Sequence, residues 1–558
     1  MSGRPQAPRT LLLLASAGSL LWLAAAGPHS TLTGSGDLPA QVLDDLSPSS
    51  GPFLRAVPGT ASPNLEIVHP EILSLRLRFD EILASTGNRR GRWGILAVSL
   101  DRGDTLLSID PENPMVPASN VKLFTTAAAL YHLGPDFRYR TFLMADGPQS
   151  EQVLEGDLIL YGTGDPTLSE RFFPSESAPM DSLARQVMEW GITEIRGDLV
   201  VDGSYFQGPD LHPDWDPRDL NDSFAAPVAS VGVNENLVTV KVNPGPSVGT
   251  PAWVRAEPDG SGLEVLNLTR TLPAGTRSRV WLLRDTPWDP IGIEGEMPLG
   301  SPAIWRSLPV PEPLLFTGLQ LMRSLESHGI RVRGSVVVNR DADVSRLSPA
   351  SIMGGTQGAP APRILGTLSS PPLLEILRVI NKRSNNLFAE SVSKTLGRIV
   401  LGDGSFSGGQ RVVERFLVQQ VGADGEKLRV RDGSGLSSEN TASAETLLQV
   451  LAFMADSPWW EDYWSTLPEA GVRGELGRMF RTPAAGNLRA KTGTLRNVSA
   501  LSGMVTTQAG ERILFSILSN EVASAYGAKR VEDQIGIRLA SLTRPLPDPP
   551  PFGSPLTN

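Results

Sequence analysis

The chain has 558 residues, of which 40% are hydrophobic and 20% are charged, a composition typical of a globular protein with several domains. Its formal net charge is −10, so no basic surplus exists to neutralise nucleic-acid phosphates, and we expect no nucleic-acid partner. The chain contains no cysteine, which excludes disulfides, thiolate metal sites, a cysteine nucleophile and a cysteine-linked lipid anchor.

The first 26 residues have the three-part pattern of a secretory signal peptide. Arg4 and Arg9 precede a mostly apolar stretch from Leu11 to Ala26, which ends in three alanines before the helix-breaking pair Gly27-Pro28. An uncleaved membrane anchor is the alternative, but this stretch is shorter than the roughly 20 residues that span a bilayer. We therefore expect export to the periplasm, with residues 1–26 removed and no stable membrane span left.

The segments next to the two ends are not expected to fold. Residues 27–64 are rich in Gly, Ser and Pro, which predicts a flexible linker. From Arg544 onward the sequence RPLPDPPPFGSPLTN is incompatible with a helix. Residues 544–558 are therefore predicted to be a disordered, proline-rich tail.

Helices and strands are mixed between these ends. Apolar side chains of residues 72–83 share one helical face, residues 95–100 and 105–109 are predicted to pair as strands, and a helix should begin near Ser119. From about residue 162 to residue 350 the chain is rich in predicted strands, at 199–202, 237–242, 280–283 and 332–339, with helical pieces near 182–190 and 313–327. Helices return across 371–397 and 441–455, and residues 488–506 and 511–519 are predicted to form a pair of strands.

This order indicates an α+β fold in which a helix-and-sheet domain is split by a large β-rich insertion. We expect the first part of the split domain at residues 65–162 and its second part at residues 351–543. The insertion, as one or two subdomains, is expected at residues 163–350.

Two common catalytic chemistries find no support in the sequence. The chain has only five histidines, one of them at the end of the predicted signal peptide, which disfavours a Ser–His–Asp triad. It also has no H-x-x-x-H or H-E-x-x-H spacing and no G-x-x-x-x-G-K-[ST] phosphate loop. We therefore expect no metal and no cofactor.

A serine activated by a lysine remains as a hypothesis. The seven lysines complete S-x-x-K twice, at Ser119–Lys122 and at Ser391–Lys394, and complete K-T-G once, at Lys491–Gly493. Ser384 and Asn386 form an S-x-N match between them. Each motif is weak by itself, so order and context must supply the specificity.

The first S-x-x-K has the better context. Ser119 opens a predicted helix, where free backbone N–H groups favour developing negative charge, and the spacing places the Lys122 amine beside its hydroxyl. A lysine with its ordinary pKa of ~10.4 is a poor base, but burial and a second cation, for which Lys491 is a candidate, favour the neutral amine. The pair Ser391/Lys394 is predicted to lie within a helix, without free N–H groups to hold an oxyanion, so we expect it not to be catalytic.

The order S-x-x-K, S-x-N, K-T-G resembles the signature of penicillin-binding proteins and serine β-lactamases. Within that superfamily the chain is similar to the class C low-molecular-mass penicillin-binding proteins, which are D-alanyl-D-alanine carboxypeptidase/endopeptidases. The 265-residue interval from Ser119 to Ser384 agrees with this branch, which inserts β-rich domains there. The likeness is carried by PASNVKLFTTAAAL at 117–130, LSSPPLLEILRVINKRSNNLFAE at 368–390, DGSGLSSENTASAETLLQVL at 432–451 and AGNLRAKTGTLRNVSALSGMV at 485–505.

The resemblance implies a β-lactamase/transpeptidase-like domain, with an antiparallel sheet flanked by helices. It implies that Ser119 is the nucleophile, Lys122 the base and Ser384 a proton relay. The implied substrate-binding residues are Asn386, Lys491, Thr492, Gly493 and Thr494. Gly493 is expected to let an extended peptide lie against its strand, and the N–H groups of Ser119 and Thr494 are expected to form an oxyanion hole.

Two substrate-binding assignments rest on weaker likeness. Asp219 resembles an insertion-domain carboxylate that meets the amine of a diamino acid, although a surface-loop aspartate is the alternative. Arg496 stands where some relatives have glutamine, near the substrate side chain. Asp432 and Ser434 are expected to shape a turn beside the site.

The expected function is that of an exported serine-type D-alanyl-D-alanine carboxypeptidase/DD-endopeptidase. Its substrates would be the stem peptides and cross-links of peptidoglycan, cleaved through an acyl-enzyme at Ser119, and β-lactams would be covalent inhibitors. A serine β-lactamase or esterase of the same fold is one alternative and would differ by fast deacylation. A non-catalytic peptidoglycan-binding homologue is the other.

Overall fold

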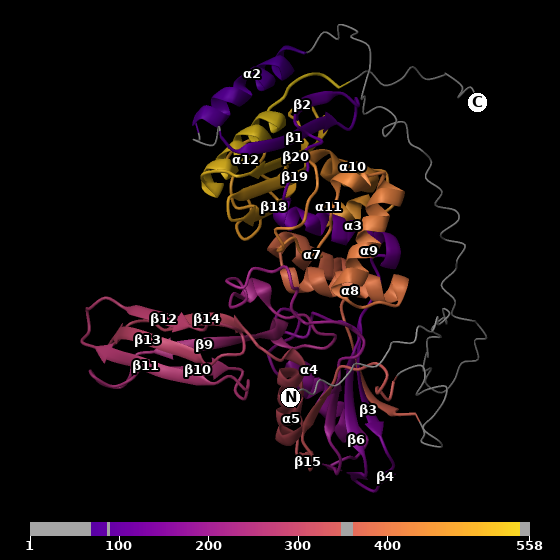
Figure 1. Ribbon diagram of the computed structural model, residues 1–558, viewed down its shortest axis with the longest axis vertical. Coiled ribbons are helices and arrows are strands. Elements are labelled where there is room, and N and C mark those ends of the chain that lie inside the picture. The colour runs from indigo at the N-terminus through magenta and orange to yellow at the C-terminus, as the bar shows by residue number, and fades with distance from the viewer. Residues whose placement is uncertain (1–68, 86–89, 348–360, 547–558) are drawn as a thin grey trace, which may run out of the picture.

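The computed structural model describes residues 69–85, 90–347 and 361–546 of the chain (Figure 1). The predicted signal peptide at 1–26 and the predicted linker at 27–64 lie outside the described residues. Among the helices of the described ranges, none has the length and apolar character needed to span a membrane.

Strands from both ends of the chain form one antiparallel sheet of five strands, in the order β18-β19-β20-β1-β2. The predicted pairing of residues 95–100 with 105–109 is confirmed as β1 with β2. The stretch 488–506, predicted as one strand, is instead a hairpin, because the chain turns at Asn497, whose φ of 58° lies in the left-handed region that asparagine tolerates. The strand bounds are β1 (Arg92–Ser99), β2 (Thr105–Ile109), β18 (Arg489–Leu495), β19 (Val498–Thr506) and β20 (Arg512–Asn520).

Helices cover both faces of this sheet. Because successive side chains of a strand point to opposite faces, Ile95 and Ala97 join a core with α2 and α12, whereas Leu96 joins the core formed with the other helices. Figure 1 shows α2 and α12 on one side and the helical layer on the other. The helix bounds are α2 (Pro70–Ser85), α3 (Val121–Leu133), α7 (Leu373–Arg383), α8 (Asn386–Leu401), α9 (Phe406–Phe416), α10 (Ala444–Ala455), α11 (Trp460–Thr466) and α12 (Ala525–Ala540).

A second five-stranded sheet, ordered β16-β8-β6-β3-β17, lies within the interval between Ser119 and Ser384. Two helices, α4 (Ala178–Glu189) and α5 (Pro313–Ser327), pack on it and share its hydrophobic core. Strands β3 and β6 precede residue 163 and β17 follows residue 350, so this sheet extends beyond the predicted insertion at both ends. The strands of this sheet are β3 (Arg140–Asp146), β6 (Asp157–Gly162), β8 (Leu199–Asp202), β16 (Val336–Asn339) and β17 (Arg363–Ser369). A small four-stranded sheet, ordered β15-β7-β5-β4, lies beside it. Its strands are β4 (Gln149–Ser150), β5 (Val153–Leu154), β7 (Glu194–Ile195) and β15 (Arg331–Val332).

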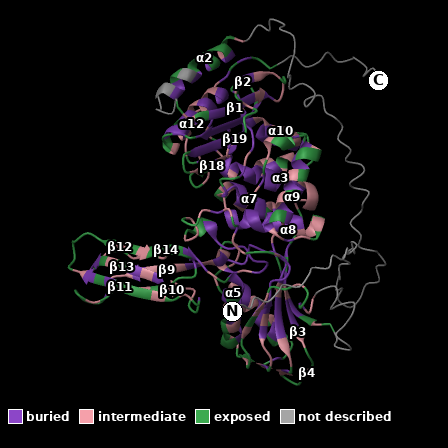
Figure 2. Ribbon diagram, viewed as in Figure 1, coloured by how far each residue is buried: buried purple, intermediate pink, exposed green. Residues whose placement is uncertain are grey.

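Two three-stranded sheets, β10-β9-β14 and β11-β13-β12, project to one side of the molecule (Figure 1). We call this pair of sheets the arm. A small hydrophobic core joins them, while their outer faces are largely exposed, as Figure 2 shows. Its strands are β9 (Leu237–Asn243), β10 (Trp253–Glu257), β11 (Val265–Leu272), β12 (Arg279–Leu283), β13 (Ile291–Pro298) and β14 (Ile304–Pro309).

The first residue of the predicted disordered tail is anchored to the sheet. Arg544 is buried, and its guanidinium contacts Asp104 Oδ2 at 2.6 Å and Glu511 Oε2 at 2.6 Å. These two carboxylates fix the arginine, so the prediction of disorder is wrong at this position. Residues 547–558 of the predicted tail lie outside the described residues.

Candidate active site

Ser119 lies in a short 3₁₀ turn, η2 (Ala118–Asn120), that leads directly into α3. The α-helix itself begins at Val121, slightly later than predicted. The turn is tightly enclosed: a Cβ atom on Gly435 would lie 2.0 Å from the carbonyl oxygen of Ala118. Because no side chain fits there, glycine at 435 allows the DGSGLS loop to approach the turn that carries Ser119.

Gly493 lies tightly against the turn that carries Ser119. A Cβ atom at this position would lie 2.9 Å from the Pro117 carbonyl oxygen and 3.0 Å from Asn120 Nδ2. The missing side chain therefore makes room for the turn before Ser119. The result is that β18 lies directly against η2.

The Lys122 amine is fully buried and has three polar neighbours. Its Nζ atom lies 3.2 Å from Ser119 Oγ, 2.6 Å from Asn386 Oδ1 and 2.6 Å from the Ser434 carbonyl oxygen. A neutral amine has two hydrogens, which Asn386 and Ser434 can accept, and one lone pair, which is left for the Ser119 hydroxyl proton. Burial lowers the pKa of Lys122 to about 7, against the opposing attraction of the Asp432 and Glu390 carboxylates. The amine can therefore act as a base near neutral pH.

Ser384 lies at a sharp break between α7 and α8, within the region 371–397 that was predicted to be helical. Its backbone is left-handed, with φ 53° and ψ 36°, and Asn385 then caps α8 by accepting from the Phe388 N–H at 3.1 Å. Asn386 donates from Nδ2 to the Phe224 carbonyl oxygen at 2.8 Å, which orients its Oδ1 toward Lys122. The break thus presents both S-x-N side chains to the site.

Lys491 reaches the same place from β18. Its buried amine donates to Ser384 Oγ at 2.9 Å and to the Thr492 carbonyl oxygen at 2.8 Å. Burial, and then the charge of Lys122, hold the pKa of Lys491 well below its usual range. For Lys122, burial is the largest cause of the lowered pKa, whereas the sequence had suggested a second cation as a joint cause.

Ser119, Ser384 and Asn386 line a cavity of about 470 Å³ between the split domain and the insertion. Thr494, Asp219 and Arg496 line it as well, whereas Lys122, Lys491, Thr492 and Gly493 are not among its lining residues. The residues that line it are Ser119, Asp216, Arg218, Asp219, Phe224, Ser384, Asn386, Gly435, Leu436, Thr494, Leu495 and Arg496.

Charged side chains of the insertion form one wall of this cavity. Arg218 Nε donates to Asp216 Oδ1 at 2.9 Å, and this hydrogen bond lowers the pKa of Asp216 to about 2. Partial burial and the charges of Asp216 and Asp222 raise the pKa of Asp219. Sequence reasoning identified Asp219 but missed Asp216 and Arg218, for which the charge-rich stretch DWDPRDLND was the available signal.

Glu390 is a further residue that sequence reasoning missed. Its buried carboxylate on α8 accepts from the backbone N–H groups of Gly433 and Ser434, at 2.9 and 2.8 Å. The carbonyl of that same Ser434 holds the Lys122 amine, so Glu390 acts on the base through the loop. Burial raises the pKa of Glu390, while the two N–H groups that it accepts from oppose the shift by stabilising the carboxylate. The signal available in the sequence was a carboxylate inside the otherwise apolar stretch NLFAESV.

Asp432 fixes the rest of the DGSGLS loop. It accepts from the backbone N–H groups of Gly435 and Ser437, both at 2.7 Å, and from Trp215 Nε1 at 3.0 Å. The loop is therefore held from inside by Asp432 and tied to the insertion through Trp215.

The second S-x-x-K lies within α8, as predicted, and outside the cavity lining. The Lys394 amine is buried over the rings of Phe206 and Phe406, at 5.1 and 4.5 Å from their centroids. Ser391 has helix on both sides. Within the described ranges, no group of three or more His, Asp or Glu side chains is arranged to hold a metal ion.

A helix-flanked antiparallel sheet, with hydrogen bonds of Lys122 and Lys491 joining the three motifs beside one cavity, is the arrangement expected of a penicillin-binding protein. The model of the D-Ala-D-Ala carboxypeptidase 3 (S13) family matches residues 75–542, so the chain belongs to this family of serine-type carboxypeptidases. It is 33% identical over 497 residues to a D-alanyl-D-alanine carboxypeptidase of Actinomadura sp., covering 86% of this chain and 87% of that relative.

Solved structures show the same fold. The crystal structure of penicillin binding protein 4 from Haemophilus influenzae superposes with a TM-score of 0.70 at 23% identity, covering 83% of this chain and 99% of that one. A complex of that protein with a β-lactam superposes with a TM-score of 0.65 at 21% identity, covering 83% of this chain and 100% of that one. The α+β fold and the family inferred from the motifs are thereby confirmed.

Proposed function

We propose that the protein cleaves D-alanyl-D-alanine termini and D-amino-acid cross-links of peptidoglycan as a serine carboxypeptidase/DD-endopeptidase. One observation carries the proposal: the Ser119 hydroxyl lies 3.2 Å from a fully buried Lys122 amine, at a cavity that Ser384 also lines. Membership of the D-Ala-D-Ala carboxypeptidase family supports the substrate class.

In the acylation step, the neutral Lys122 amine takes the proton of Ser119 as Oγ attacks the carbonyl carbon of the penultimate D-alanine. The backbone N–H groups of Ser119 and Thr494 hold the oxyanion, a type of contact worth ~2.7–4 kcal/mol per donor in another enzyme. The C–N bond then breaks, and the leaving amine receives a proton through Ser384, which accepts from Lys491 at 2.9 Å. Water hydrolyses the resulting ester and restores Ser119.

Lys491 and Thr492 are proposed to bind the terminal carboxylate of the substrate. A carboxylate placed beside a buried amine favours the protonated form of that amine. Substrate binding would therefore charge Lys491, and the nearby positive charge would help to keep Lys122 neutral. This division gives the two buried lysines different roles, one as an anion-binding group and one as a base.

Asp219 and Arg496 are proposed to contact the substrate side chain that precedes the scissile dipeptide. Both line the cavity, and Asp216 and Arg218 lie on the same wall. A carboxylate there suits the free amine of a diamino acid, while Arg496 suits a carboxylate of the same residue. The pairing of opposite charges favours a side chain that carries both groups.

β-Lactams are proposed as covalent inhibitors that acylate Ser119. The test is to incubate the full chain with a fluorescent penicillin, with Ser119→Ala and Ser391→Ala as a matched pair of variants. A long-lived adduct that is lost only in Ser119→Ala supports the peptidase, together with release of D-alanine from a peptide ending in D-Ala-D-Ala. Rapid turnover of the penicillin would identify a β-lactamase or esterase, and the absence of any adduct would identify a non-catalytic binding protein.

The proposed location is the periplasm, reached by removal of residues 1–26. Expression of the full chain, followed by cell fractionation and N-terminal sequencing of the mature protein, tests this. A protein that retains Met1 and sediments with membranes would show that the segment acts as an anchor.

A further inference from the structure

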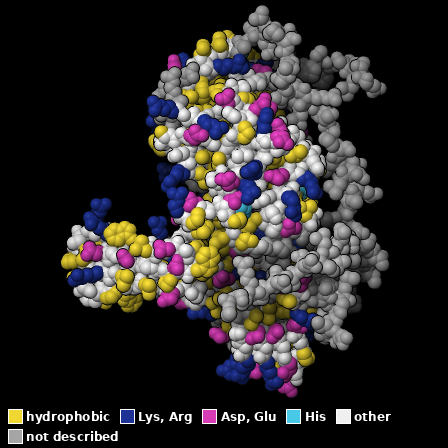
Figure 3. Space-filling model, in the orientation of Figure 1, with side chains coloured by type: hydrophobic (Ala, Val, Ile, Leu, Met, Phe, Trp, Pro, Cys, Tyr) yellow, Lys and Arg dark blue, Asp and Glu magenta, His cyan; other side chains and the backbone are white. Residues whose placement is uncertain are grey.

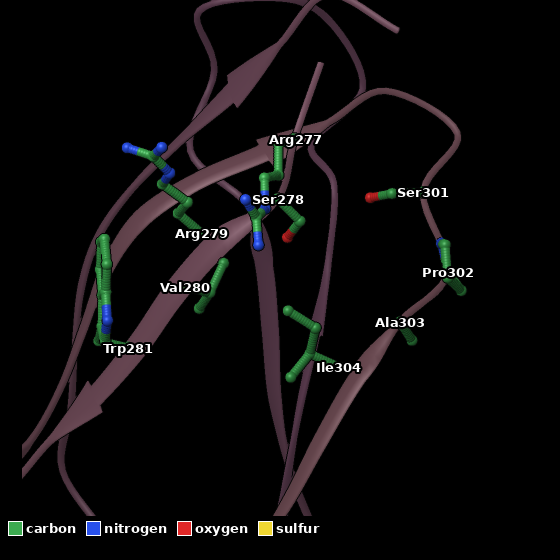
Figure 4. Close-up of a pocket in the computed structure, with 9 residues that line it drawn as sticks. All are labelled: Arg277, Ser278, Arg279, Val280, Trp281, Ser301, Pro302, Ala303 and Ile304. Atoms are coloured by element: carbon green, nitrogen blue, oxygen red, sulfur yellow. The ribbon is translucent and has the colours of Figure 1, made fainter. Parts of the chain in front are cut away.

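The arm contains a second cavity, of about 630 Å³, which shares no lining residue with the cavity at Ser119 (Figure 4). Residues 277–281 line one side and residues 301–304 line the other. Val280 and Ile304 supply an apolar surface, while Ser278 and Ser301 place hydroxyl groups around it. The cavity is therefore mixed in character, and not a simple hydrophobic gap.

The two strands beside this cavity are edge strands. Within the described strands, β12 pairs only with β13, and β14 pairs only with β9. Each therefore keeps one row of backbone N–H and C=O groups without a ladder partner, which is the feature that lets an extended peptide add to a sheet. A ligand with a peptide backbone suits this arrangement better than a bare sugar chain.

The charge of the cavity is positive although the whole chain carries −10. Arg277 and Arg279 line it, and no carboxylate does. Neither arginine has an ion pair with any described residue, and both are exposed. Glu296 lies opposite Arg279 in the β12–β13 register but is not among the lining residues. Such a surface complements an anionic ligand.

Trp281 is also exposed and lies with Arg279 on the outer face of β12, whereas Val280 lies on the inner face (Figure 4). A partner with carboxylates, a peptide backbone and small apolar side chains would use all of these features together. We infer that the arm binds a second, acidic stem peptide of peptidoglycan between β12 and β14. The inference rests on the proposed function, because it takes the same polymer as substrate and extends its contact to the arm.

The test measures retention of the full-length protein on purified, insoluble peptidoglycan, with the active site blocked beforehand by penicillin. The double variant Arg277→Ala/Arg279→Ala is compared with Arg270→Ala, an exposed arginine on β11 that does not line the cavity. Exposed charge pairs are individually weak, so we expect the double variant to bind about five- to tenfold less tightly at low salt. The difference should shrink as salt is raised, because exposed charges are screened. Acylation by fluorescent penicillin should be equal in all three proteins, which keeps this test separate from that of the proposed function.

Two further probes decide the chemistry of the ligand. Soluble stem peptides should compete for the arm, while the same peptides with amidated carboxylates should compete poorly. Glycan strands stripped of peptides should not compete. Unchanged retention of the double variant, equal loss in Arg270→Ala, or equal competition by stripped glycan would each overturn the inference.

Discussion

The ionisable groups around Lys122 are buried, whereas large side chains of the arm are exposed. At the cavity, the amines of Lys122 and Lys491 and the carboxylate of Glu390 are all 0% exposed, and each is held by hydrogen bonds. On the arm, Trp253 is 71% exposed and Trp305 is 51% exposed. Figure 3 shows hydrophobic and charged side chains interspersed over this projecting surface.

This difference in exposure gives lysine side chains two different uses, one in chemistry and one in binding. A buried amine changes its protonation behaviour, because desolvation penalises the charged form, and so becomes a reactive group. The Lys241 amine of the arm instead lies over the exposed ring of Trp305, 4.1 Å from its centroid, where it can contact a partner. Substitutions of the buried amines should therefore change the chemical rate, and substitutions on the arm should change binding to large substrates only.

The strongest test of this difference is to remove one of the buried amines. Lys122→Met keeps the approximate shape of the side chain but removes the proposed base, and we expect penicillin acylation to slow by about 10²–10⁴-fold. Lys394→Met is the matched control, because Lys394 is also a buried lysine three residues after a serine. Stopped-flow acylation measures both. If Lys394→Met slowed acylation as much as Lys122→Met, the loss would reflect removal of any buried lysine and not removal of the base.

The pH dependence of acylation tests the same claim without a substitution. Only the neutral amine accepts a proton, and the pKa of Lys122 is lowered to about 7. Acylation should therefore be half-maximal near pH 7, nearly constant above about pH 8, and fall by about tenfold per unit well below pH 7, as the amine becomes protonated. The rate of adduct formation between pH 5 and pH 9 measures this. A rate that still rises by about tenfold per unit up to pH 9, as expected for a lysine with its ordinary pKa of ~10.4, would contradict a base tuned by burial.

A smaller effect on acylation is expected from replacing Glu390, which acts on Lys122 through the Ser434 loop. In Glu390→Gln the amide cannot accept from both Gly433 and Ser434, so the carbonyl that holds Lys122 should shift and acylation should slow by roughly tenfold. Loss of the negative charge should also move the acid limb to lower pH, because the Glu390 carboxylate raises the pKa of Lys122.

Glu414→Gln is the control for this variant. Glu414 also accepts from a loop backbone, the Val430 N–H at 2.9 Å, but no hydrogen bond joins it to the residues around Lys122 among those described. We expect its pH profile to match that of the unmodified protein. A shifted limb in Glu414→Gln would mean that general loosening of the loop, and not the charge of Glu390, sets the behaviour of the base.

The motifs were sufficient to predict the family and the fold, because their order and the long interval are properties of sequence alone. Glu390 could not be assigned in the same way, since its role depends on a loop more than 40 residues later that folds back over α8. The helix break at Ser384 was also missed, because no glycine or proline marks it. The disorder predicted at Arg544 was wrong because the local signal, the prolines after it, is misleading. The carboxylates that fix this arginine, Asp104 and Glu511, are remote in sequence.

The smallest effect is expected at the wall that the insertion contributes. Asp219→Asn keeps the shape of the side chain but removes a partly buried carboxylate that lines the cavity. If Asp219 meets the amine of a diamino acid, KM for such a peptide should rise by about three- to fivefold with little change in kcat. Peptides with a neutral side chain there, and penicillin, should react as before. Asp222→Asn is the matched control, because Asp222 lies nearby but does not line the cavity. An equal rise in KM for peptides with a neutral side chain would show that Asp219 maintains the shape of the cavity wall and does not bind the substrate amine. The specificity of the site would then depend on Arg496 and on the residues of β18 next to it.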